Sequence, residues 1–172
     1  MAVGSRAPDF RAVNLASGDT VSLSEYGGDV VLFNIWATWC APCEYEMPSM
    51  QRLYDRLGPR GLRIVALSVD QARPQHVVDW VQERELTFDI LHDPTGRIEQ
   101  TYLVTGYPES YVIDRDGMIV KKVIGPREWD HATEQALFRQ LLGIADEAPD
   151  SAAVTSPEER RARDDVATPG GP

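Results

Sequence analysis

The residues of this chain best suited to chemistry are two cysteines, Cys40 and Cys43. They are the only cysteines among 172 residues, and two residues separate them. A structural disulfide framework needs more bridges spread along the chain. A structural zinc site needs four ligands, and the three histidines lie far from this pair in sequence. The spacing therefore predicts a redox-active disulfide, with no metal and no further cofactor.

The residues around the pair predict which thiol attacks. Val30 to Trp36 is an apolar run typical of a buried strand, and helical periodicity follows Cys43. Cys40 should therefore lie at a helix N-terminus, where the dipole and unpaired N–H groups favour the thiolate. We expect Cys40 to form a mixed disulfide with the substrate, and Cys43 to resolve it. Pro42 fits the first helical turn, where a missing N–H costs little.

Glu46 follows Cys43 by three residues, which is about one helical turn. A buried carboxylate at this position would have a raised pKa because burial disfavours its charged form. Such a group would accept the proton of Cys43. The alternative is a solvated glutamate on the helix surface, like its neighbour Glu44.

The pattern along the chain predicts an α/β fold, a mixed central sheet flanked by helices with an N-terminal β-hairpin. A turn containing Gly117, which favours a positive φ, should join the last two strands. The expected strands are 10–15, 20–23, 30–36, 63–69, 110–114 and 118–124. The expected helices begin after Cys43, at Pro74, at Asp93-Pro94 and at Asp130 as N-cap.

Two regions differ in composition. Residues 1–145 are long enough for one domain with its own core. Residues 146–172 are acidic and rich in proline, with few apolar side chains. Such a segment cannot offset its ordering entropy, so we expect a disordered tail.

The formal net charge of −10 argues against a nucleic-acid partner, which requires clustered Lys and Arg. No stretch approaches the roughly 20 apolar residues of a membrane span. The N-terminus has no apolar core of a signal peptide. We therefore expect either a cytosolic protein or one whose leader or anchor is absent from this sequence.

Several single residues admit ordinary interpretations. Trp39, next to Cys40, is expected on a surface that docks partners, whereas Trp129 is expected to serve packing. The three histidines are expected at the surface; they are His76, His92 and His131. The Tyr107-Pro108 bond precedes a predicted strand and is a candidate cis peptide, although base rates alone do not favour one.

These motifs resemble the thioredoxin superfamily, and within it the TlpA/ResA/DsbE (CcmG) group of extracytoplasmic disulfide reductases. The resemblance covers about Gly4 to Gly143 and is most specific over Trp36–Cys43, with Pro48 following. It implies a thioredoxin-like fold. Asn34 stands where thioredoxin has a buried aspartate, which implies that Glu46 has taken over the handling of the proton.

The segment Gly106–Ser110 resembles the cis-proline segment of DsbE-type proteins. The resemblance implies that Pro108 is the cis proline and that Glu109 lines the substrate groove. Tyr107 belongs to the same predicted substrate surface, together with Trp39 and Pro42. Gly125-Pro126 followed by Trp129 also resembles this subgroup.

The resemblance implies a reductase of protein disulfides, including the heme-binding thiols of apocytochrome c. It further implies a monomer tethered outside the cytoplasmic membrane, in the periplasm or on the outer face of the inner membrane. Its electrons would come from a membrane thiol transporter.

Two other functions remain open. Ala7–Phe10 also resembles peroxiredoxins, which suggests an antioxidant peroxidase. In that family a threonine precedes the reactive cysteine by three residues, whereas Thr38 precedes Cys40 by two. A dithiol also binds Cu(I), so a thioredoxin-like metallochaperone is the non-enzymatic alternative, although it would need a third ligand. One equivalent of copper bound tightly after purification would favour the metallochaperone.

Overall fold

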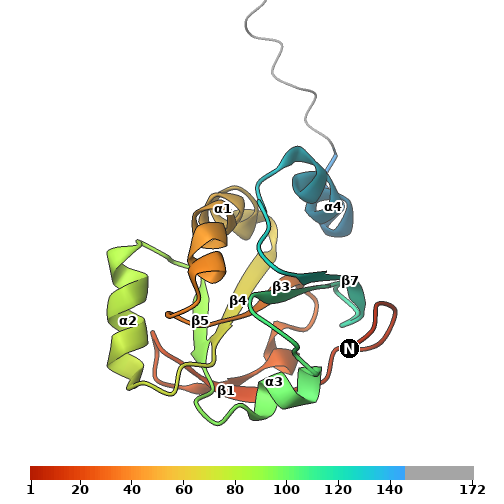
Figure 1. The fold of residues 1–172 in the computed structure, drawn as a ribbon. Coiled ribbons are helices and arrows are strands. Elements are labelled where there is room, and N and C mark those ends of the chain that lie inside the picture. Colours follow the sequence, from red (N-terminus) through yellow and green to blue (C-terminus); the bar gives the residue numbers. More distant parts are fainter. Residues whose placement is uncertain (146–172) are drawn as a thin grey trace, which may run out of the picture.

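A seven-stranded mixed sheet forms the centre of the protein (Figure 1). The computed structural model describes residues 1–145, so the predicted tail over 146–172 lies outside the described residues. The strands are β1 (Arg11–Asn14), β2 (Thr20–Ser22), β3 (Val30–Trp36), β4 (Leu62–Ser68), β5 (Asp89–His92), β6 (Glu109–Ile113) and β7 (Ile119–Ile124). Their order across the sheet is β2-β1-β5-β4-β3-β6-β7.

The three inner strands β3, β4 and β5 run parallel, and the outer pairs are antiparallel. Every residue of β3 is buried, which explains its uninterrupted apolar run, since both faces of the strand are covered. The register pairs Trp36 with Ser68 at the last positions of β3 and β4. The loops that follow these two strands therefore begin side by side at one edge of the sheet.

Four α-helices cover the sheet, and α1 and α4 lie on the opposite side from α3 (Figure 1). They are α1 (Ala41–Leu57), α2 (Pro74–Glu83), α3 (Arg97–Tyr102) and α4 (Ala132–Leu142). Two short 3-10 segments lie at Leu23–Tyr26 and Gly58–Arg60. None of the helices in residues 1–145 combines the length and apolar composition needed to cross a bilayer.

An aromatic cluster ties the N-terminal segment to the sheet. The ring of Phe10 stacks on Phe33 of β3 with centroids 4.8 Å apart, and Tyr102 contacts both rings. Tyr111 of β6 extends the cluster, 5.1 Å from Tyr102. This packing joins the hairpin β1–β2 to the same core as the central strands.

The structure confirms the α/β fold with its N-terminal hairpin, and Gly117 adopts the expected positive φ of 78°. It adds one strand that the sequence pattern did not predict, β5. This strand has four residues and pairs with β4 on one side and β1 on the other. Pairing on both sides supplies its stability, and a local pattern cannot show that.

Three further sequence predictions were wrong: the starts of two helices, and the position of His92, which is described below. The third helix begins at Arg97 and not at Asp93; the Asp93 carboxylate instead accepts hydrogen bonds from the Thr95 and Ile98 N–H groups. Asp130 is not the N-cap of α4, because its carboxylate pairs with Arg52 at 2.5 Å and His131 is the cap.

His92 is also buried, contrary to the prediction of a surface position. Its Nε2 lies 2.8 Å from the carbonyl oxygen of Asp70. The histidine belongs to β5, which has a paired strand on each side, so its burial follows from a strand that the sequence pattern did not predict.

Candidate active site

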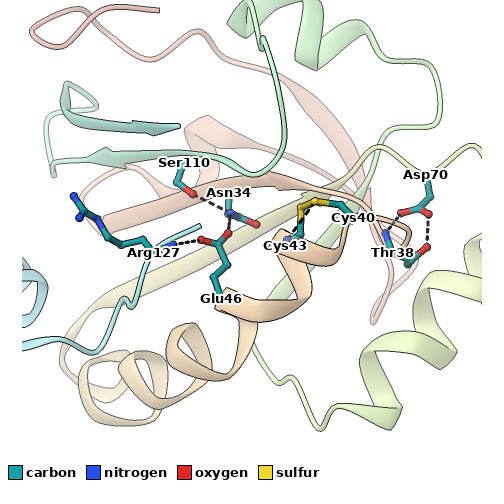
Figure 2. Close-up of a disulfide and its surroundings, with 8 residues drawn as sticks. All are labelled: Asn34, Thr38, Cys40, Cys43, Glu46, Asp70, Ser110 and Arg127. Carbon is teal, nitrogen blue, oxygen red and sulfur yellow. Dashed lines mark hydrogen bonds between the residues drawn. A yellow bond between two sulfur atoms is a disulfide. The ribbon is translucent and has the colours of Figure 1, made fainter. Parts of the chain in front are cut away.

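The two cysteines form a disulfide at the start of α1, with Cα atoms 5.3 Å apart (Figure 2). Cys40 is the N-cap of the helix, and its Sγ accepts a hydrogen bond of 3.2 Å from the N–H of Cys43. Cys40 retains 6% of its accessible surface and Cys43 none. Cys40 is therefore the more accessible of the two sulfurs, and the N–H donor to its Sγ favours a thiolate there. Pro42 lies in the first turn, as expected.

Glu46 is completely buried, which removes the alternative of a solvated surface residue. Three groups donate hydrogen bonds to its carboxylate. Asn34 Nδ2 lies 2.7 Å from Oε1, and the Arg127 N–H and Trp129 Nε1 lie 3.1 Å and 3.0 Å from Oε2. Figure 2 shows the bonds from Asn34 and Arg127, one turn along α1 from the disulfide.

Burial raises the pKa of Glu46 from 4.5 to about 7. The three donors favour the charged form and lower the pKa, but the loss of hydration outweighs them. A carboxyl group with a pKa near neutrality can take up a proton and release it again at physiological pH. Glu46 therefore has the proton affinity that its predicted role requires.

The two donors to Oε2 come from the segment between β7 and α4, and Ser49 helps to hold that segment against α1. Its hydroxyl donates to the Glu46 carbonyl at 2.8 Å and accepts from the Trp129 N–H at 2.9 Å. Trp129 also packs its ring against Phe138 of α4. Trp129 thus combines the predicted packing role with a polar role that the sequence did not indicate.

A cluster of ion pairs around Glu134 also holds the segment between β7 and α4. The buried Glu134 of α4 receives both its hydrogen bonds from Lys121 Nζ, at 2.8 and 2.7 Å. The Arg127 guanidinium lies 3.3 Å from the same carboxylate. Residue 127 is therefore fixed through its side chain while its backbone N–H reaches Glu46.

The Tyr107–Pro108 peptide bond is cis, as expected. Pro108 is buried, and the ring of Tyr107 meets the ring of Trp39 edge to face with centroids 5.6 Å apart. Trp39 is 66% exposed. The structure thus brings together the cis-proline segment and the tryptophan next to Cys40.

Glu109 follows the cis proline, but its side chain is fully buried inside the protein. Its carboxylate pairs with Lys122 Nζ at 2.9 Å and accepts a hydrogen bond from the Tyr111 hydroxyl. Burial raises the pKa of Tyr111, so this hydroxyl stays protonated and remains a donor. The assignment of Glu109 to substrate binding stays a prediction.

Asp70 is a site residue that the sequence analysis missed. The buried carboxylate accepts hydrogen bonds from the Thr38 N–H at 2.9 Å, the Thr38 hydroxyl at 2.5 Å and the Ser68 hydroxyl at 2.7 Å (Figure 2 shows the two from Thr38). It thereby fixes Thr38, which precedes Cys40 by two residues. The sequence shows only that Asp70 follows a predicted strand; the pairing of β3 with β4, which brings Asp70 to Thr38, is a feature of the fold.

A groove of about 660 Å³ borders this region on the side of Trp39. Its lining includes Thr38, Trp39, Asp70, His76, Glu99 and Tyr107. The Tyr107 hydroxyl donates to Glu99, so a polar contact holds part of the groove lining in place. Among residues 1–145, no group of three or more His, Cys, Asp or Glu side chains is placed to hold a metal ion.

Comparison with known proteins agrees with this geometry. A model of the AhpC/TSA family matches residues 3–122. The chain belongs to the AhpC/TSA family. Within it, a thiol-disulfide oxidoreductase ResA of Bacillus cereus is 38% identical over 125 residues, which are 73% of this chain and 71% of that protein. ResA of Geobacillus kaustophilus is 39% identical over 145 residues, 84% of this chain and 79% of its own.

Solved structures place this AhpC/TSA family member in the same group. A thiol:disulfide interchange protein DsbE from Chlorobium tepidum superposes with a TM-score of 0.71 at 30% identity. The match covers 83% of this chain and 97% of that one. The predicted thioredoxin-like fold of the ResA/DsbE kind is thereby confirmed, and the protein is a thiol–disulfide oxidoreductase.

Proposed function

We propose that this oxidoreductase reduces protein disulfides, with Cys40 as nucleophile, Cys43 as resolving thiol and Glu46 as proton acceptor. The observation that carries the proposal is the buried Glu46, which lies one turn beyond the buried Cys43 and has a pKa of about 7. The disulfide of this structure is the oxidised state that the enzyme reaches at the end of one turnover.

The reaction consists of two exchanges. In the first, the Cys40 thiolate attacks one sulfur of the substrate disulfide, forms a mixed disulfide and expels the other substrate sulfur as a thiolate. In the second, Cys43 gives its proton to Glu46 and attacks Cys40 Sγ, which releases the second substrate thiolate. The substrate gains two electrons, and the enzyme dithiol loses them. The protonated Glu46 then returns its proton to solvent.

The substrate surface follows from the same geometry. The exposed Trp39 next to Cys40 contacts the ring of Tyr107, Pro42 lies between the two cysteines, and Pro108 follows Tyr107 across the cis bond. We assign these residues to substrate binding. Glu109 supports this surface from within through its pair with Lys122.

The partners and location of the enzyme are part of the proposal. The family resemblance supports apocytochrome c as a substrate, whose two heme-binding cysteines must be reduced before heme attachment. It also supports a place outside the cytoplasmic membrane, with a membrane thiol transporter as electron donor and the enzyme as a monomer. A disulfide-bonded peptide containing Cys-X-X-Cys-His is the direct test substrate.

The direction of the reaction is tested by the reduction potential of the Cys40–Cys43 pair, equilibrated against dithiothreitol or glutathione buffers. A reductase should lie near or below about −270 mV, the value of thioredoxin. A potential near about −120 mV, typical of strong oxidants, would mean that the protein donates disulfides, and the reductase proposal would fail.

The roles of the two cysteines are tested by trapping. Cys43→Ser should accumulate a mixed disulfide with the peptide, seen by mass spectrometry, and Cys40→Ser should not. Equal trapping by both variants would contradict the assignment. The wild-type protein, with both cysteines, tests the alternatives: one tightly bound equivalent of copper would favour a metallochaperone, and faster oxidation by hydrogen peroxide than by the peptide would favour a peroxidase.

A further inference from the structure

Asn34 of β3 is completely buried, and its side-chain amide faces Glu46. The Nδ2 group donates to Glu46 Oε1 at 2.7 Å and to Ser110 Oγ at 2.9 Å. When Glu46 is ionised it only accepts hydrogen bonds, so in that state the amino end of the amide faces Glu46. The oxygen end, Oδ1, therefore points away from the carboxylate.

This oxygen is a buried acceptor without a donor among residues 1–145. Buried polar atoms are nearly always paired, so an unpaired one in a site calls for an explanation. In Figure 2 the oxygen end of the Asn34 amide is turned toward the disulfide. Cys43 is the nearer cysteine along α1, one turn from Glu46, and as part of a disulfide it carries no hydrogen to donate.

We propose that Asn34 Oδ1 accepts a hydrogen bond from the Cys43 thiol in the reduced enzyme, so that one amide bridges Cys43 and Glu46. Asn34 then acts as a positioning residue: it holds the S–H group and the carboxylate next to each other. When Cys43 attacks Cys40, its S–H group turns from Asn34 Oδ1 to the Glu46 carboxylate, which takes the proton, and the amide neither gains nor loses one. This inference rests on the proposed role of Glu46.

The other groups around Glu46 do not duplicate this bridge. The Arg127 N–H and Trp129 Nε1 donate hydrogen bonds to Oε2, the other oxygen of the Glu46 carboxylate. The charged side chains on or beside the segment between β7 and α4 are paired elsewhere: Arg127 and Lys121 with Glu134, and Glu128 and Asp130 with Arg52. Asn34 is thus the residue that contacts the oxygen Oε1 and also carries an unused acceptor.

The first test is infrared spectroscopy of the Cys40→Ala variant, in which Cys43 is the only thiol. Its S–H stretching band should lie at the lowered frequency of a hydrogen-bonded thiol. Adding Asn34→Leu, which is similar in size but has no polar atoms, should move the band to the frequency of an unbonded thiol. Adding Ser110→Ala should leave the band in place, because Ser110 contacts the amino end of the amide.

An unbonded S–H band in Cys40→Ala, with Asn34 intact, would overturn the inference even if the leucine variant failed to fold. The second test is kinetic and uses wild-type cysteines. Asn34→Leu, or Asn34→Ser if leucine is not tolerated, should slow the resolution of the mixed disulfide by at least about tenfold. Alkylation of Cys40 by iodoacetamide should keep its rate, since Asn34 does not act on the first exchange.

Two outcomes separate this inference from the proposed function. If Glu46→Gln slows resolution and Asn34→Leu does not, the bridge is wrong and the role of Glu46 stands. If Glu46→Gln leaves resolution unchanged, the proton acceptor itself is wrong, whatever Asn34 does.

Discussion

Cys43 and Glu46 lie one helical turn apart on α1, and neither side chain reaches solvent. A thiol in such a place has no direct contact with bulk water, so a basic group beside it is its nearest proton acceptor. A carboxylate with a pKa of about 7 is available instead, in the same buried region. Under the proposed mechanism, this spacing on the helix would couple the reactivity of Cys43 to the protonation of Glu46.

The buried acid should make stability depend on pH. The folded-state pKa of Glu46 is about 7 and its ordinary value is 4.5, so between these values the native state binds more protons than the unfolded state. Stability should fall as pH rises through this window and level off above it, by about 3 kcal/mol in total.

This dependence is measured by urea unfolding of the oxidised protein, in which the cysteines do not titrate. The stability of wild type relative to Glu46→Gln should decrease from about pH 4.5 to about pH 7.5, since glutamine carries no ionisable group. A constant difference between the two proteins across this range would show that Glu46 ionises at its ordinary pKa.

Loss of the indole donor should raise the pKa of Glu46 further. Trp129→Phe keeps the ring that packs against Phe138 but removes the Nε1 hydrogen bond to Oε2. The pH midpoint of mixed-disulfide resolution should move upward by roughly half a unit to one unit. Trp80→Phe is the matched control, because Trp80 packs on Trp36 and does not contact Glu46. Equal midpoints in Trp129→Phe and wild type would argue against this hydrogen bond.

Removal of the Asp70 carboxylate should destabilise the loop before Cys40. Asp70→Ala leaves three donors on Thr38 and Ser68 without their acceptor, so we expect a loss of about 2–3 kcal/mol in chemical denaturation. Asp79→Ala provides the control, since Asp79 is exposed on α2 and should change stability by less than about 0.5 kcal/mol. Similar losses in both variants would mean that the Asp70 contacts contribute little.

The ion pair between Lys121 and the buried Glu134 should contribute more to stability than an ion pair at the surface. Lys121→Met deprives the buried Glu134 of its closest partner, and we expect a loss of about 3 kcal/mol. Arg63→Met breaks the exposed pair with Asp29 and should cost less than about 1 kcal/mol. The comparison uses thermal and urea unfolding of both variants, and equal costs would contradict the structural role of Glu134.

The sequence predicts the local parts of this site well. The position of Cys40 at a helix start, the burial of Glu46 and the cis bond before Pro108 agree with the structure, because each follows from short-range pattern or from the family motif. The sequence also predicts the burial of β3, because its uninterrupted apolar run is typical of a strand that is covered on both faces.

The contacts that tune the site are not local, and the sequence did not indicate them. Trp129 and Arg127 reach Glu46 across more than 80 residues, and Asp70 reaches Thr38 across 32. Strand β5 likewise depends on its two neighbours and not on its own four residues. Such partners follow from the register of the sheet and the packing of α4, which a pattern along one chain does not contain.

The segment that donates to Glu46 also sets an order of events during synthesis. A ribosome makes the Cys40–Cys43 pair first and adds Arg127 and Trp129 more than 80 residues later. A growing chain therefore contains both cysteines and Glu46 before it contains Arg127 and Trp129, whose N–H groups lower the pKa of Glu46. A chain that ends before Arg127 would therefore contain both cysteines and Glu46 but lack two of the three groups that donate hydrogen bonds to the Glu46 carboxylate.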